Sequence, residues 1–113
     1  MNEHELLLKR INLLEYHQKL LVKLLNNPNL EFYKLIIEYG LTEQEIDKFY
    51  YLCNELSMKL DEQKAEGYVY FHPLFAKFSA SLPTKMKIED VIKACLLQKL
   101  YEPLFQEFEK YLK

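Results

Sequence analysis

Glycine, proline and an excess of either charge are scarce in this sequence, and each shortage excludes a class of protein. The 113 residues include two Gly and four Pro, too few turn-forming residues for a fold of many short strands. The formal net charge of −2 provides no general field that attracts the chain to nucleic acid or to an anionic membrane. No apolar run approaches the ~18 residues of a membrane span. The composition therefore favours a soluble protein made of a few long helices.

The sequence also lacks tryptophan and has only two cysteines, Cys53 and Cys95. Both fall on predicted apolar helix faces. The N-terminus, Met-Asn-Glu-His-Glu, has neither the basic start nor the small-residue cleavage site of a secretory signal. Two thiols in such a chain fit a reducing cytosol better than a disulfide framework. We therefore expect buried free thiols in a cytoplasmic protein.

Apolar residues are abundant: half of the chain is hydrophobic, and 14% is aromatic, with nine Tyr and seven Phe. This composition excludes disorder through lack of apolar surface. A chain of this length suits one domain, which buries roughly two-thirds of the surface that the unfolded chain exposes. We therefore predict a single domain over residues 1–113, an all-α bundle of about five to six helices with a long N-terminal helix and a long central helix.

The best-marked element is the central helix between Gly40 and Gly67. Gly40 suits the left-handed residue that closes a preceding helix, and Gly67 ends the central one. Thr42 and Glu45 form a capping box, in which each side chain satisfies a free backbone N–H. The apolar residues follow a 3-4-3-4 spacing, which places them on one helical stripe that faces a core or a partner: Ile46, Phe49, Cys53, Leu56 and Leu60.

The remaining helices are bounded by prolines and polar clusters. The first covers residues 3–26 and ends at the cluster Asn26-Asn27-Pro28-Asn29, and residues 30–39 form a short helix that is apolar almost all round and serves as a central strut. Residues 68–71 form an extended linker, since no second strand is present to pair with them. Three more helices are expected over residues 72–81, from about residue 88 to near residue 101, and from Pro103 to the end of the chain.

The N-terminal helix has a heptad pattern. Its first core position is held by His4, Ile11, Gln18 and Leu25, and its second by Leu7, Leu14 and Leu21. A second apolar stripe runs along another side: Leu6, Leu13, Leu20 and Leu24. We predict that one stripe packs on the helix's own domain and that the other forms an oligomer interface, at Leu7, Ile11, Leu14, Gln18, Leu21 and Leu25. A polar Gln18 in such a seam fixes register or copy number at some cost in stability. The alternative is that both stripes serve one thick intramolecular bundle.

The two ends of the central helix carry a family resemblance. The start Gly40-Leu41-Thr42 and the end Gln63-Lys64-Ala65-Glu66-Gly67, with the sequence between them and RINLLEYHQKLLVKLL before them, resemble the YhaI-like family of small uncharacterised bacterial proteins. The resemblance covers most of the chain. It implies an all-helical, oligomeric fold and implies no function. Because these motifs are structural caps, no catalytic residue is carried over.

The sequence contains no recognisable catalytic, cofactor or metal site. His4 and His17 point about 140° apart on one helix, so they do not chelate one ion within a protomer. A nucleophilic pair would require Cys53 and a histidine, but Cys53 lies in the middle of an apolar stripe, where a thiol behaves as a small inert hydrophobe. Both glycines are helix stops, which excludes a phosphate-binding loop. We expect no enzyme activity, no cofactor and no metal.

Nucleic-acid binding is an alternative with little support. The stretch Gly40 to Ile46 is similar to the turn that enters a helix of a helix-turn-helix protein. The helix that follows it has an acidic leading face of Glu43, Glu45 and Asp47, which repels phosphates. The lysines near the C-terminus are interleaved with acidic residues, as on an ordinary solvated surface.

The aromatic surplus points instead to protein partners, since tyrosine is enriched where proteins meet. The expected contacts are Tyr50, Tyr68, Tyr70 and Phe71, although such rings also serve as caps on the edges of a core. The sequence thus predicts a protein–protein interaction or regulatory module, an adaptor or an inhibitor, that binds itself and another protein. The alternatives are a nucleic-acid-associated regulator and a small enzyme with a pocket between helices.

Overall fold

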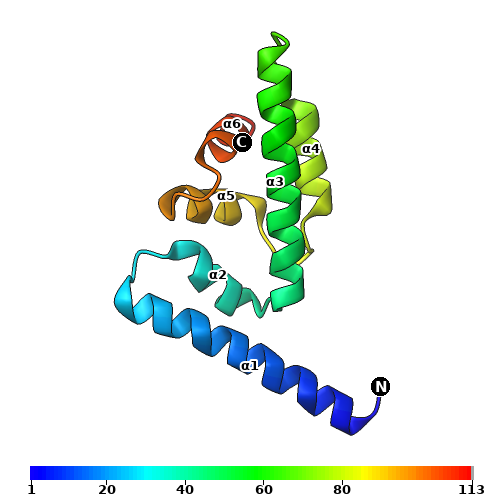
Figure 1. The fold of residues 1–113 in the computed structure, drawn as a ribbon, viewed down its shortest axis with the longest axis vertical. Coiled ribbons are helices and arrows are strands. Elements are labelled where there is room, and N and C mark those ends of the chain that lie inside the picture. Colours follow the sequence, from blue (N-terminus) through cyan, green and yellow to red (C-terminus); the bar gives the residue numbers. More distant parts are fainter. Residues whose placement is uncertain (113) are drawn as a thin grey trace.

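The computed structural model describes residues 1–112 and places six α-helices in them (Figure 1). The helices are α1 (Glu3–Asn26), α2 (Glu31–Tyr39), α3 (Glu43–Ala65), α4 (His72–Ser81), α5 (Ile88–Leu97) and α6 (Glu102–Glu109). The all-α prediction is confirmed, and the first four helices begin and end close to the predicted residues. The last two are shorter than predicted, because α5 ends at Leu97 and α6 ends at Glu109.

The predicted caps between α2 and α3 are present. Gly40 has a φ of 65°, and the Leu41 N–H donates to the Ile36 carbonyl at 2.9 Å. The Glu45 N–H donates to the Thr42 hydroxyl at 3.1 Å, and the Thr42 N–H donates to the Glu45 carboxylate at 3.0 Å. These bonds satisfy backbone groups that a helix end leaves free, so α2 stops and α3 starts within a few residues.

The end of α5 explains one wrong boundary. Lys99 has a φ of 61°, and the Leu100 N–H donates back to the Cys95 carbonyl at 2.8 Å. This is the hydrogen bond that usually accompanies a glycine at a helix end. Tyr101 is also left-handed, with a φ of 49°, and lies at the start of α6. Neither residue type signals such a conformation, so a helix end was not predictable at this point.

The core is centred on the apolar stripe of α3, and all five predicted stripe residues are buried. Phe49 is its hub. Its ring centroid lies 5.0 Å from that of Phe32 on α2, 6.0 Å from that of Phe78 on α4 and 6.5 Å from that of Phe105 on α6. One aromatic cluster therefore joins four helices.

The helix α1 lies across the end of the molecule at which α3 begins, and α2 lies between α1 and α5 (Figure 1). The short helix α2 buries Phe32 and Ile36 and so acts as the predicted strut. The first turn of α2 has no cap from its own chain segment. Instead, the Gln98 side-chain oxygen accepts from the N–H groups of Phe32 at 2.8 Å and Tyr33 at 3.3 Å.

Candidate interaction surfaces

The two apolar stripes of α1 have different surroundings. On the second stripe Leu20 is buried and Leu13 and Leu24 are half-buried, while Leu6 near the helix start is exposed. The helix α2 and the rest of the molecule lie along one side of α1 (Figure 1), and the burial of this stripe places it on that side. The C-terminal half of α1 is thus attached to the domain on one side, as predicted.

The heptad seam lies about 120° around α1 from this stripe and is exposed. We call its six residues the heptad face: Leu7, Ile11, Leu14, Gln18, Leu21 and Leu25. The five apolar members are exposed by 58%, 49%, 67%, 50% and 84%, respectively. Leu8 and Val22 beside them are exposed as well. An apolar face of this length, interrupted by Gln18 alone, is uncommon on a monomeric protein and is typical of an interaction surface.

Contacts around Tyr16 and His17 fix the orientation of α1. The His17 Nε2 atom donates to the Leu41 carbonyl at 2.9 Å, which joins α1 to the turn before α3. Tyr16 is half-buried, and burial, together with the nearby carboxylates of Glu43 and Asp47, raises the pKa of its hydroxyl to about 12. The tyrosine is therefore neutral at physiological pH. In a single copy of the chain, these contacts therefore hold α1 in an orientation that leaves the heptad face exposed.

The predicted aromatic contacts do not all lie on the surface. Tyr68 and Tyr70, in the segment between α3 and α4, are exposed by 53% and 61%. Phe71 is only 3% exposed, and its N–H donates to the Tyr111 hydroxyl at 2.9 Å. Its ring is part of the core and offers no surface to a partner, so its prediction as a partner contact is wrong.

Tyr50 also faces largely inward. Its ring lies 6.2 Å from that of Phe32 and 6.3 Å from that of Tyr101, and burial raises the pKa of its hydroxyl. Tyr50 is half-buried and caps the core edge, the alternative that the sequence left open. Tyr68 and Tyr70 are therefore the two predicted partner residues that are exposed.

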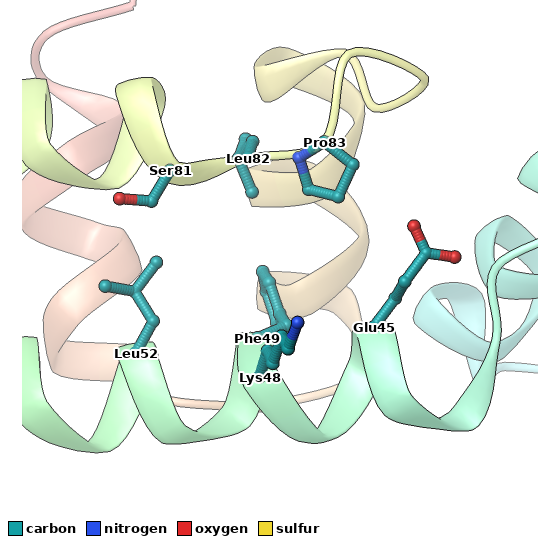
Figure 2. Close-up of a pocket in the computed structure, with 7 residues that line it drawn as sticks. All are labelled: Glu45, Lys48, Phe49, Leu52, Ser81, Leu82 and Pro83. Carbon is teal, nitrogen blue, oxygen red and sulfur yellow. The ribbon is translucent and has the colours of Figure 1, made fainter.

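A small pocket of about 320 Å³ lies between α3 and the end of α4 (Figure 2). It is lined by Glu45, Lys48, Phe49, Leu52, Ser81, Leu82 and Pro83. Two of its polar groups already have structural partners. Glu45 completes the capping box, and the Ser81 hydroxyl donates to the Lys77 carbonyl at 2.8 Å. The Ser81 hydroxyl thus donates to a backbone carbonyl and not to a basic side chain, whereas an activated serine nucleophile donates to its base.

The thiols are buried and free, as predicted. Burial raises the pKa of Cys53 to about 12, and burial together with Cys53 raises the pKa of Cys95. Both are therefore protonated at physiological pH and unreactive, because the thiolate is the nucleophilic form. Within residues 1–112 no group of three or more His, Cys, Asp or Glu side chains is arranged to hold a metal ion.

None of the helices in the described part of the chain combines the length and the apolar character needed to cross a membrane.

A comparison with known protein families finds one match that covers almost the whole chain. The family model described as "Protein of unknown function (DUF1878)" matches residues 4–113. The match includes α1 with its heptad face and extends through the segment that carries Tyr68 and Tyr70.

Proposed function

Because the chain belongs to the DUF1878 family, whose function is unknown, we propose a function from its surface: a small helical interaction module, an adaptor or an inhibitor, that self-associates through α1. The observation that supports this proposal is the exposed heptad face. Five aliphatic side chains on one line of one helix remain about half exposed or more. Each gains on the order of 1 kcal/mol when a partner removes that surface from water.

The self-association test introduces two charges into the heptad face, as Leu14→Asp with Leu21→Asp. Both side chains are exposed and outside the core, so the monomer should keep its helical content. A seam that contains two carboxylates opposite apolar side chains does not form. We expect the mass measured by light scattering to fall from an oligomer to a monomer.

A matched control adds the same two charges elsewhere on α1, as Asn12→Asp with Asn26→Asp. Both asparagines are exposed and lie off the heptad face. This variant should retain the oligomeric mass. If the Leu14/Leu21 variant kept the same mass as the unmutated chain, the heptad face would not be the interface.

We assign the second protein partner to the exposed segment between α3 and α4. Tyr68 and Tyr70 present large amphipathic rings there, and tyrosines of this kind are frequent energetic centres of interfaces. Tyr68→Ala with Tyr70→Ala should remove binding of that partner in an affinity capture and leave the oligomeric mass unchanged. Intact capture of every partner would refute the assignment.

The proposal also covers enzymatic activity, cellular location and relationship within the family. The proposed role is not enzymatic, because both thiols are buried and protonated and the Ser81 hydroxyl donates to a backbone carbonyl and not to a base. The proposed location is the cytoplasm of a bacterium, in line with the reduced cysteines. Because its helix caps resemble those of the YhaI-like proteins, we propose that the chain is related to them within the family.

A further inference from the structure

The heptad face has a polar residue in the middle of an apolar line, and this residue distinguishes two ways of pairing the helix. Gln18 is exposed, with Leu14 before it and Leu21 after it on the same face. We infer that α1 pairs with α1 of a second copy of this chain in a parallel, in-register arrangement. This inference rests on the self-association proposed above and adds its direction and register.

The amide of Gln18 favours the parallel arrangement. In a parallel, in-register pair each heptad position meets itself, so Gln18 faces the Gln18 of the second copy. A primary amide both donates and accepts, and the two side chains satisfy each other. In an antiparallel pair the position of Gln18 faces the other core position, which is Leu7, Leu14 or Leu21. The amide would then be buried without a partner, which is costly.

The charged residues beside the heptad face also favour the parallel arrangement. Arg10 and Glu15 are exposed on opposite flanks of the heptad face, and neither takes part in an ion pair within residues 1–112. In a parallel pair these two flanking positions, five residues apart, meet across the interface, so Arg10 of each copy reaches Glu15 of the other. In an antiparallel pair the flank of Glu15 meets itself and presents only Leu8, Glu15 and Val22, none of which is a cation.

The available area is sufficient for a second copy. Seven aliphatic side chains on the outward side of α1 are exposed by about half or more: Leu7, Leu8, Ile11, Leu14, Leu21, Val22 and Leu25. Together they leave on the order of 600 Å² per copy, near the ~800 Å² per partner of a standard interface. The other helices all lie along one side of α1 (Figure 1), and the heptad face is exposed, so a second helix can approach it.

The arrangement has a functional consequence. A parallel pair has its two-fold axis along α1, which places the two domains on opposite sides of the helix pair. The exposed segment with Tyr68 and Tyr70 then occurs twice in one particle. The adaptor is bivalent, and its avidity for a partner with two sites exceeds the affinity of either site alone.

A single introduced cysteine tests whether the two α1 helices run parallel. A disulfide requires Cα atoms within about 7 Å, which a parallel, in-register pair offers at every seam position. In an antiparallel pair Gln18 faces Leu14 or Leu21, so the two copies of residue 18 are offset by at least three residues, about 4.5 Å along the axis, in addition to the 8–10 Å between helix axes. We expect Gln18→Cys to form a covalent dimer under mild oxidation, read on a non-reducing gel.

The native chain supplies a clean background for this experiment, because Cys53 and Cys95 are buried and protonated. The matched control is Asn12→Cys, which is exposed on the same helix about 120° away from Gln18. It should stay monomeric on the gel. If Gln18→Cys gave no more covalent dimer than Asn12→Cys while light scattering showed an oligomer, the parallel register would be wrong and self-association would stand. If the unmutated chain were a monomer, both the parallel register and the proposed self-association would be wrong.

A charge exchange gives an independent readout. Arg10→Glu alone and Glu15→Arg alone should each weaken association about three- to tenfold, since each places like charges across the interface. The double exchange should restore the dissociation constant to within about twofold of the original, because the pair is re-formed with its signs reversed. A double variant weaker than both single variants would contradict the proposed pairing.

Discussion

At the scale of single residues, Gln98 holds two helices together. Its side-chain oxygen accepts from two N–H groups in the first turn of α2, whose own N-terminal residue Leu30 supplies no side-chain cap. Gln98 itself lies just after α5. The residue therefore acts as a helix cap supplied from 66 positions away in the chain.

Replacing this cap should cost stability. We expect Gln98→Ala to lower the free energy of unfolding by about 1–2 kcal/mol, because two part-buried N–H groups lose their acceptor. Gln98→Glu keeps the acceptor and adds a negative charge at a helix N-terminus, so it should be neutral or stabilising. Urea denaturation measures both. Lys93→Ala on the exposed side of α5 is the control, and equal loss in Lys93→Ala and Gln98→Ala would contradict the capping role.

Sequence reasoning did not find Gln98, and it placed Phe71 on the wrong side of the fold. A cap that comes from a distant segment leaves no local pattern, since its partners are adjacent only after folding. In the segment from Tyr68 to Phe71 every residue is apolar or aromatic, so no alternation indicates which ring turns inward. Phe71 is held inward because it directly precedes α4 and its N–H donates to the Tyr111 hydroxyl, a contact between residues 40 positions apart.

At the scale of helices, α3 was predictable because its signals are local. The capping box of Thr42 and Glu45 and the glycines at both ends are each read within a few residues, and the core stripe repeats along one helix. The end of α5 was not predictable in this way, because Lys99 adopts a left-handed conformation without glycine. The two stripes of α1 were predictable from spacing, and the structure decided which one faces the domain.

The N-terminal half of α1 has little support within its own chain. All residues up to Asn12 are exposed, although Asn2 caps the helix by accepting from the Glu5 N–H at 2.8 Å. An isolated helix of about 12 residues is marginal in water. This half of α1 is therefore expected to fray in a lone copy and to become stable when the heptad face is paired.

Amide hydrogen exchange tests this expectation. Protection of residues 4–12 should rise with protein concentration, because pairing buries Leu7 and Ile11, whereas protection within the core stripe of α3 should change little. In the Leu14→Asp, Leu21→Asp variant, residues 4–12 should exchange rapidly at every concentration. Equally strong protection of this segment in dilute and concentrated samples would show that α1 needs no partner.

At the scale of the whole molecule, one core built around Phe49 joins α2, α3, α4, α5 and α6, and α1 adds only one of its two apolar stripes to this core. On the proposed pairing of α1, two terms contribute to stability: folding of the core, which is independent of concentration, and pairing of α1, which depends on it. Any binding that favours the native state raises the midpoint of thermal unfolding in proportion to the logarithm of concentration.

The midpoint of thermal unfolding should consequently rise by a few degrees for each tenfold increase in concentration of the unmutated chain, since 1 kcal/mol shifts a domain of this size by roughly 4–8 °C. The Leu14→Asp, Leu21→Asp variant should unfold at a lower temperature that is the same at every concentration, because its core is intact and its pairing is lost. The Asn12→Asp, Asn26→Asp variant should follow the unmutated chain. A concentration-independent midpoint for the unmutated chain, measured between about 1 and 100 µM, would mean that the heptad face contributes nothing to stability through pairing.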